Sequence, residues 1–136
     1  PVGTAPNYLI TGDFNRDQRA DLVVSNGDSG TITVAFGGAS AFTTVSYPAG
    51  QTPTALLAED LTGDGIDDIL VTSLQSGDFR VLVGDGAGSF PGVSHFPGTL
   101  GASDALLQDM DGDGRRDLLI SSLISNRVSL VRNIRQ

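Results

Sequence analysis

The sequence has 136 residues and a net charge of −8, because 16 acidic residues stand against 8 arginines and no lysine. This acidic balance argues against a nucleic-acid partner, since phosphate binding needs a concentration of Lys and Arg. Without cysteine the chain has no disulfides, no thiolate nucleophile and no zinc-thiolate site, and no apolar run reaches the roughly 18 residues of a membrane span. With 39% apolar residues, 18 glycines and 6 prolines, we expect a packed domain of short strands and tight turns.

One segment occurs three times along the chain. The first copy, LITGDFNRDQRADLVVSN at 9–26, returns as LLAEDLTGDGIDDILVTS at 56–73 and as ALLQDMDGDGRRDLLISS at 105–122. A fixed period of this kind is typical of repeat architectures. We therefore divide the single domain, 1–136, into repeats of approximately 1–48, 49–97 and 98–136.

Each repeat predicts four short strands, which in the first repeat are roughly 7–12, 21–26, 30–36 and 42–48. The second run is apolar throughout, which indicates a strand covered on both faces. The third run alternates in character and predicts one well-buried face. Four strands in each period are typical of β-propeller blades. We expect an all-β fold of three four-stranded antiparallel blades, the last lacking its outer strand, as part of a larger or oligomer-completed propeller.

Between its first two strands each repeat has the spacing D-x-[N/D/T]-x-D-x-x-x-D. Alternate side chains of a tight loop converge on one point, and hard oxygen ligands at such spacing suit Ca²⁺. We predict up to three Ca²⁺ ions, one in each repeat, with the residue at the seventh position giving only its backbone carbonyl. The predicted ligands are Asp13, Asn15, Asp17, Arg19 and Asp21; Asp60, Thr62, Asp64, Ile66 and Asp68; and Asp109, Asp111, Asp113, Arg115 and Asp117.

Two other interpretations of this motif are weaker. A solvated hairpin turn explains one copy, because Asp, Asn and Gly are ordinary turn residues, but it does not require oxygen-bearing residues at fixed offsets in three copies. An EF-hand requires a bidentate Glu at the twelfth position, where this chain has Val24, Val71 and Ile120. Calcium-binding hairpin loops therefore remain the favoured prediction.

The segments GDFNRDQRADLVV, EDLTGDGIDDILV and QDMDGDGRRDLLI resemble the calcium loop and following strand of the FG-GAP/VCBS repeat, the blade unit of integrin α-subunit propellers. Residues 84–90, GDGAGSF, resemble the Gly-rich turn of that family, and the resemblance covers nearly the whole chain. The first loop has Gln18 where the family prefers Gly, and a left-handed backbone there would cost about 1 kcal/mol. The second loop has Thr62 in place of an acidic or amide ligand. We therefore expect the third loop to bind calcium most strongly.

The resemblance implies a calcium-binding extracellular module, secreted or at the cell surface, that serves protein or matrix interaction, adhesion or surface assembly. Its partner would be a protein, a matrix component or further copies of the chain. Two alternatives stay open: a self-assembling structural or filament subunit, and a lectin-like propeller that binds a glycan at Tyr8 or Tyr47. We expect no enzyme, because the lone histidine, His95, reads as an outer-strand residue that replaces Tyr47.

Overall fold

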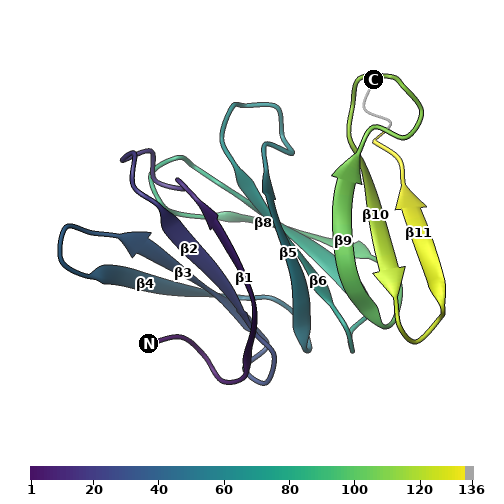
Figure 1. The fold of residues 1–136 in the computed structure, drawn as a ribbon, viewed down its shortest axis with the longest axis horizontal. Helices are drawn as coiled ribbons and strands as arrows, with labels where there is room; N and C mark the ends of the chain where they lie inside the picture. Colours follow the sequence, from purple (N-terminus) through teal and green to yellow (C-terminus); the bar gives the residue numbers. More distant parts are fainter. Residues whose placement is uncertain (134–136) are drawn as a thin grey trace.

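The computed structural model describes residues 1–133, which form strands and turns and no helix (Figure 1). Three antiparallel sheets lie side by side, with strand orders β1-β2-β3-β4, β5-β6-β7-β8 and β11-β10-β9. The strands are β1 (Pro6–Gly12), β2 (Asp21–Asn26), β3 (Thr31–Gly37), β4 (Phe42–Pro48), β5 (Pro53–Glu59), β6 (Asp68–Ser73), β7 (Asp78–Val83), β8 (Gly92–Pro97), β9 (Ala102–Gln108), β10 (Asp117–Ser122) and β11 (Arg127–Val131). This arrangement confirms the predicted all-β fold of propeller blades. We call the three sheets blade 1, blade 2 and blade 3.

The second and third strands of every blade are joined by the same kind of turn. Its last residue has a left-handed backbone, with φ of 64° at Gly30, 64° at Gly77 and 52° at Asn126. Glycine and asparagine are the residues that adopt this conformation most readily, so the sequence at this position favours the turn. Each blade is therefore a simple meander in which neighbouring strands are consecutive in the chain.

Blade 2 is packed between the other two blades. One hydrophobic core joins blades 1 and 2 and contains Ile69 and Val71, while a second core joins blades 2 and 3 and contains Leu70. Because successive side chains of a strand point to opposite faces, β6 supplies both cores, and all six of its residues are buried. In blade 2 this confirms the prediction that the second apolar run is covered on both faces. In blades 1 and 3 the prediction holds for one face only, since Leu22, Val24 and Leu119 are half-buried.

The third strand differs from its prediction. Residues 32–35 of β3 are all buried, so this strand does not have only one buried face. The polar position among them is Thr33, whose hydroxyl accepts a hydrogen bond from Asn26 Nδ2 at 3.0 Å and lies 3.1 Å from Ser46 Oγ. Both neighbouring strands thus cover a small polar residue that the alternating pattern places in solvent.

The outer strands also correct one prediction. Tyr47 pairs with Ile32 in blade 1, whereas the equivalent position in blade 2, opposite Phe79, is taken by Phe96. His95 instead lies opposite Arg80, one residue away. The longer connection before β8 shifts the strand, so Phe96 rather than His95 replaces Tyr47.

Candidate metal-binding loops

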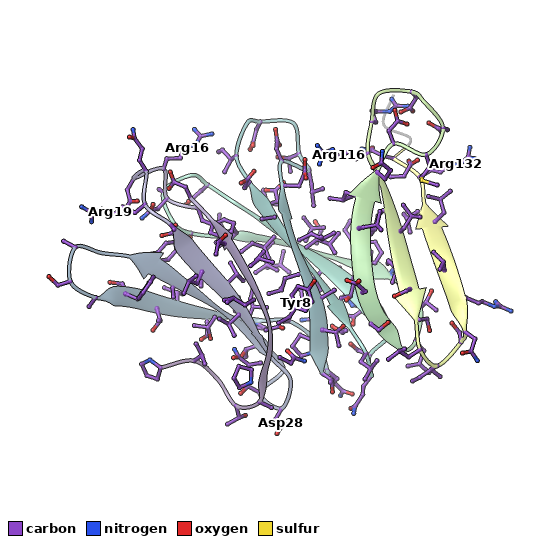
Figure 2. The ribbon with its side chains drawn as sticks, in the orientation of Figure 1. Tyr8, Arg16, Arg19, Asp28, Arg116 and Arg132 are labelled. Atoms are coloured by element: carbon purple, nitrogen blue, oxygen red, sulfur yellow. The ribbon has the colours of Figure 1, made fainter. Side chains whose placement is uncertain are left out.

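The three motif loops lie at one end of the blades, between the first and second strands of each (Figure 1). We call them loop 1 (13–21), loop 2 (60–68) and loop 3 (109–117). Figure 2 shows Arg16 and Arg19 at this end on blade 1, and Asp28 at the opposite end of the same blade. Loops 2 and 3 lie at the same end of their own blades, because each motif loop joins the first two strands of its blade.

The first aspartate of each loop accepts backbone N–H groups from residues further along the same loop. In loop 2, Asp60 accepts from Gly63 at 2.6 Å, Asp64 at 3.1 Å and Gly65 at 2.8 Å. These donors, Gly65 first, hold the pKa of Asp60 below its usual value. Asp13 accepts two such bonds at 3.0 and 2.9 Å, and Asp109 two at 2.7 and 2.9 Å. The loop backbone thus orients this carboxylate in every repeat.

The fifth position of the motif forms a second local turn. Asp17, Asp64 and Asp113 each accept the N–H two residues later at 2.9 Å. Such aspartate turns curl the chain tightly. The aspartate at the fifth position therefore has a structural reason to recur in each repeat, in addition to its predicted role as a metal ligand.

The ninth position is buried in all three loops. Asp68 is 0% exposed, and its two oxygens accept N–H groups from different parts of blade 2. Oδ2 accepts from Leu61 at 3.0 Å and Thr62 at 3.1 Å, while Oδ1 accepts from Gly84, just after β7, at 2.9 Å. The carboxylate therefore fastens the loop to the end of the third strand.

The same brace exists in the other two blades. Asp21 accepts from Phe14 and from Gly37, and Asp117 accepts from Met110 and from Asn133. Sequence reasoning identified the three aspartates as ligands but missed this bracing role and its partners. The sequence could have indicated this role, because the aspartate and the donor at the end of the third strand are 16 residues apart in every repeat.

Two positions in each loop have a left-handed backbone. Glycine occupies both in loops 2 and 3, but loop 1 has Arg16 at φ 59° and Gln18 at φ 65°. The strained conformation expected at Gln18 is present, and Arg16 is a second such position that the sequence analysis missed. The Arg16 guanidinium donates to the carbonyl of Gly65 and so joins loop 1 to loop 2.

Loop 3 brings three carboxylates together. Oxygen atoms of Asp109, Asp111 and Asp117 lie within 4.8 Å of one another. Calcium binds oxygen at about 2.3–2.6 Å, so two ligands of one ion lie at most about 5.2 Å apart. The donor set of loop 3 therefore fits a single divalent cation. Among the described residues 1–133, this is the group of three acidic side chains whose oxygens lie close enough together to share one ion.

The other predicted ligands are placed differently. In loop 3, Arg115 Nε donates to Asp113 Oδ2 at 3.0 Å, and the N–H and guanidinium of Arg115 hold the pKa of Asp113 below its usual value. In loop 1, Asn15 Nδ2 donates to Asp17 Oδ2 at 3.1 Å, so these two side chains bind each other. The carbonyl ligands at the seventh position stay predictions.

The histidine is located away from the loops. His95 Nε2 lies 2.5 Å from Asp78 Oδ2, which also accepts from Arg80 Nε at 3.2 Å, while Ser76 donates to the other oxygen of Asp78. Burial raises the pKa of Asp78, but the hydrogen bonds from Ser76, His95 and Arg80 outweigh it and leave the pKa below its usual value. These contacts tie β7 to β8 in blade 2.

A family model described as FG-GAP-like repeat matches the chain twice, at residues 13–71 and 60–120. Each match begins at the first aspartate of a motif loop and reaches the second strand of the next blade. No curated protein was found to match the chain. The described residues contain no helix of the length and apolarity needed to cross a membrane. The two matches together cover most of the sequence, and the chain therefore belongs to the FG-GAP-like repeat family, whose repeats form β-propellers.

Proposed function

We propose that the chain is a calcium-stabilised β-propeller module that presents its blades to a protein or matrix partner outside the cell. Membership of the FG-GAP-like repeat family supports the role in protein interaction. The observation that supports calcium is the convergence of Asp109, Asp111 and Asp117 in loop 3. The function proposed is binding rather than catalysis.

The chemistry of loop 3 suits a hard divalent cation such as calcium. All candidate side-chain ligands there are carboxylates, and hard oxygen ligands suit Ca²⁺. Gly112 and Gly114 take the left-handed positions of this loop without strain, unlike Arg16 and Gln18 in loop 1. Loop 3 is therefore the site we expect to bind most tightly.

An extracellular location fits weak sites. Extracellular calcium modules have dissociation constants of about 10⁻⁴ to 10⁻³ M, which match the calcium level outside cells. Calcium at about 100 times its dissociation constant stabilises the folded state by about 2.7 kcal/mol per site. The ion would offset the repulsion between carboxylates that the loops hold close together.

The carbohydrate alternative rests on Tyr8 alone. Tyr47 packs its ring edge-on against Phe90 at 5.5 Å between centroids, so it serves the core rather than a sugar platform. Tyr8 is partly exposed and lines a groove with Asn7 and Leu9. A glycan-array signal that is lost in Tyr8→Ala would favour this alternative.

The test is a calcium titration by calorimetry on the chelator-treated chain, with melting curves in calcium and in EDTA. Asp111→Ala should abolish the strongest binding event, whereas Asn15→Ala, the same position in loop 1, should leave it in place. EDTA should lower the melting temperature of the wild type. An unchanged melt in EDTA, or equal affinity at all three loops, would contradict the proposal.

A further inference from the structure

Blades 1 and 3 each have one face that no other described blade covers. On blade 1 this is the side of the sheet that faces away from the core residue Val23, and we call it the head face. It comprises Val2, Leu9, Leu22, Val24, Ala35 and Phe42. On blade 3 it lies opposite the core residue Ile120, and we call it the tail face; it comprises Leu106, Met110, Leu119, Val128 and Leu130.

Both faces expose large apolar side chains. Leu9 on the head face is 56% exposed, and Val128 on the tail face is 69% exposed. Contiguous exposed apolar surface of this kind marks an interaction site. A groove of about 130 Å³ on the tail face is lined by Leu106, Leu119 and Val128.

The tail face repeats the surface with which blade 1 packs on blade 2. Strand pairing fixes the equivalent positions, because the same partners face each other in each blade. The equivalents of Leu106, Met110, Leu119, Val128 and Leu130 in blade 1 are Ile10, Phe14, Val23, Ile32 and Val34, all of which belong to or pack against the first core.

The head face repeats the other half of that same core. Strand pairing gives Leu56, Ile69, Val71 and Leu82 of blade 2 as the equivalents of Leu9, Leu22, Val24 and Ala35, and the 47-residue repeat gives Ala49 as the equivalent of Val2. Every one of these blade 2 residues is buried in the core shared with blade 1. Head and tail are therefore the two halves of a junction that the chain already forms between blades 1 and 2. The tail face is therefore complementary, position by position, to a surface of the head-face type.

A hydrogen bond between blades recurs in the same way. Asn7 Nδ2 donates to the carbonyl of Pro53 in the next blade at 2.8 Å. Its equivalent Thr54 donates to the carbonyl of Ala102 in the next blade at 2.9 Å. The third equivalent is Ser103, at the edge of the tail face, and the corresponding acceptor on the head face is the carbonyl of Pro6.

The hydroxyl needed for a third such bond is already oriented. Ser103 Oγ lies 3.0 Å from Ser121 Oγ, as Thr54 Oγ1 lies 3.0 Å from Thr72 Oγ1. The tail face thus has the polar group of an inter-blade junction as well as its apolar surface.

We propose that two copies of the chain associate head to tail, with the tail face of each on the head face of the other. Two such contacts would close a ring of six blades, within the usual range of about four to eight. A closed ring leaves neither face open, whereas a rotation that does not close would give a filament. The proposal rests on the interaction role given above and names its partner, but it does not depend on calcium in the loops.

One residue opposes this contact. Asp104 lies on the tail face at the position that the buried Ala55 takes in blade 2. Asp104 Oδ1 accepts the N–H of Ala105 at 2.9 Å, but burying a charged carboxylate against an apolar face is costly, so Asp104 weakens the association. Asp104→Ala should therefore tighten it, which gives a variant whose effect is a gain and not a failure to fold.

The test is sedimentation of the full chain across a range of concentrations. The wild type should form a dimer of two 14.0 kDa chains. Leu9→Asp on the head and Val128→Asp on the tail should each weaken the dimer at least about ten-fold. The matched control is Val93→Asp, on the outer strand of blade 2 at 50% exposure, which should leave the dimer unchanged. Circular dichroism checks that each variant is folded.

Mixing the two face variants distinguishes head-to-tail contact from any symmetric contact. Leu9→Asp chains keep a wild-type tail and Val128→Asp chains keep a wild-type head, so the mixture has one intact junction and should regain dimers. A wild type and an Asp104→Ala variant that both stay monomeric would overturn the proposal, as would an equal effect of Val93→Asp or a mixture that stays monomeric. Growth beyond a dimer would overturn the closed ring. A monomer that binds calcium refutes only this association, and a dimer that binds none refutes only the calcium proposal.

Discussion

The buried carboxylate of Asp68 allows a substitution whose effect follows from the geometry. Asp68→Asn keeps the size of the side chain but replaces one acceptor oxygen by an amide group. Three backbone N–H groups, those of Leu61, Thr62 and Gly84, donate to Asp68 at 2.9 to 3.1 Å. Whichever way the amide is oriented, its NH₂ group must face at least one of these donors.

The cost has two parts. A hydrogen bond to a charged acceptor, worth about 1.5–3 kcal/mol, is lost, and a buried N–H is left unsatisfied at about 1–3 kcal/mol. The expected loss is therefore about 2.5–6 kcal/mol, which is a large fraction of the about 5–15 kcal/mol that stabilises a typical domain. For a chain of this size we expect a fall in melting temperature of about 8–24 °C.

Urea unfolding in EDTA measures this brace without any contribution from a metal ligand. The comparison is Asp60→Asn, at the exposed first position of the same loop. Both aspartates are predicted ligands, so both variants should lose stabilisation by calcium. In EDTA, Asp68→Asn should keep most of its loss and Asp60→Asn should show a much smaller one. Equal losses in EDTA would refute the bracing role of the ninth position.

Three further predictions follow from single positions. Leu61→Phe introduces the residue type of the equivalent Phe14 and should fill part of a groove of about 180 Å³ between blades 2 and 3. We expect it to raise the free energy of unfolding in urea by about 1 kcal/mol, whereas a lower value would show that the groove cannot hold the ring. Gln18→Gly should stabilise loop 1 by about 1 kcal/mol, because it relieves the left-handed backbone at φ 65°, and a loss of stability would contradict this. The pKa of Asp78 is lowered from 3.8, so its stabilisation is present above that value and is lost as the pH falls through the lower folded value. The destabilisation caused by Asp78→Asn, measured by urea unfolding at a series of pH values, should therefore be full at neutral pH and shrink below about 3.8, whereas a constant difference would contradict the shift.

The fold could be predicted largely because each blade contacts its neighbours through a repeated strand. Residues 69–71 of β6 are apolar in succession because alternate side chains enter different cores. The prediction for β3 was wrong because periodicity does not register how Asn26 and Ser46 cover Thr33. Solvent exposure at such a position depends on partners in other strands, which a local pattern cannot contain.

The register of the outer strand was missed for a different reason. The sequence shows that repeat 2 is longer, but it does not show how the connection between 83 and 92 takes up the extra length. A slip of one residue exchanges the two faces of a strand. That slip puts Phe96, stacked on Phe79 with ring centroids 5.0 Å apart, where the sequence suggested His95.

The candidate site was predictable in its positions but not in its division of roles. Spacing placed the carboxylates of each motif in one loop, and in loop 3 it brought together Asp109, Asp111 and Asp117. It could not show that the ninth position is buried, because the N–H that fixes Asp117 belongs to Asn133, in another part of blade 3. It also could not show that Asp113 pairs with Arg115.

The loops also connect neighbouring blades, which relates the two proposals physically. Arg16 of loop 1 donates to the carbonyl of Gly65 in loop 2, and Arg116 of loop 3 donates to Glu59, just before loop 2, at 2.6 Å (Figure 2). An ion bound in loop 2 would fix the backbone of that loop. It would therefore also fix the Gly65 carbonyl that Arg16 of loop 1 binds. In a head-to-tail pair, loop 3 of one copy would lie beside loop 1 of the other, and each of these loops contains at least three aspartates. Calcium would reduce the repulsion between them, so metal binding and blade association should reinforce each other without either requiring the other.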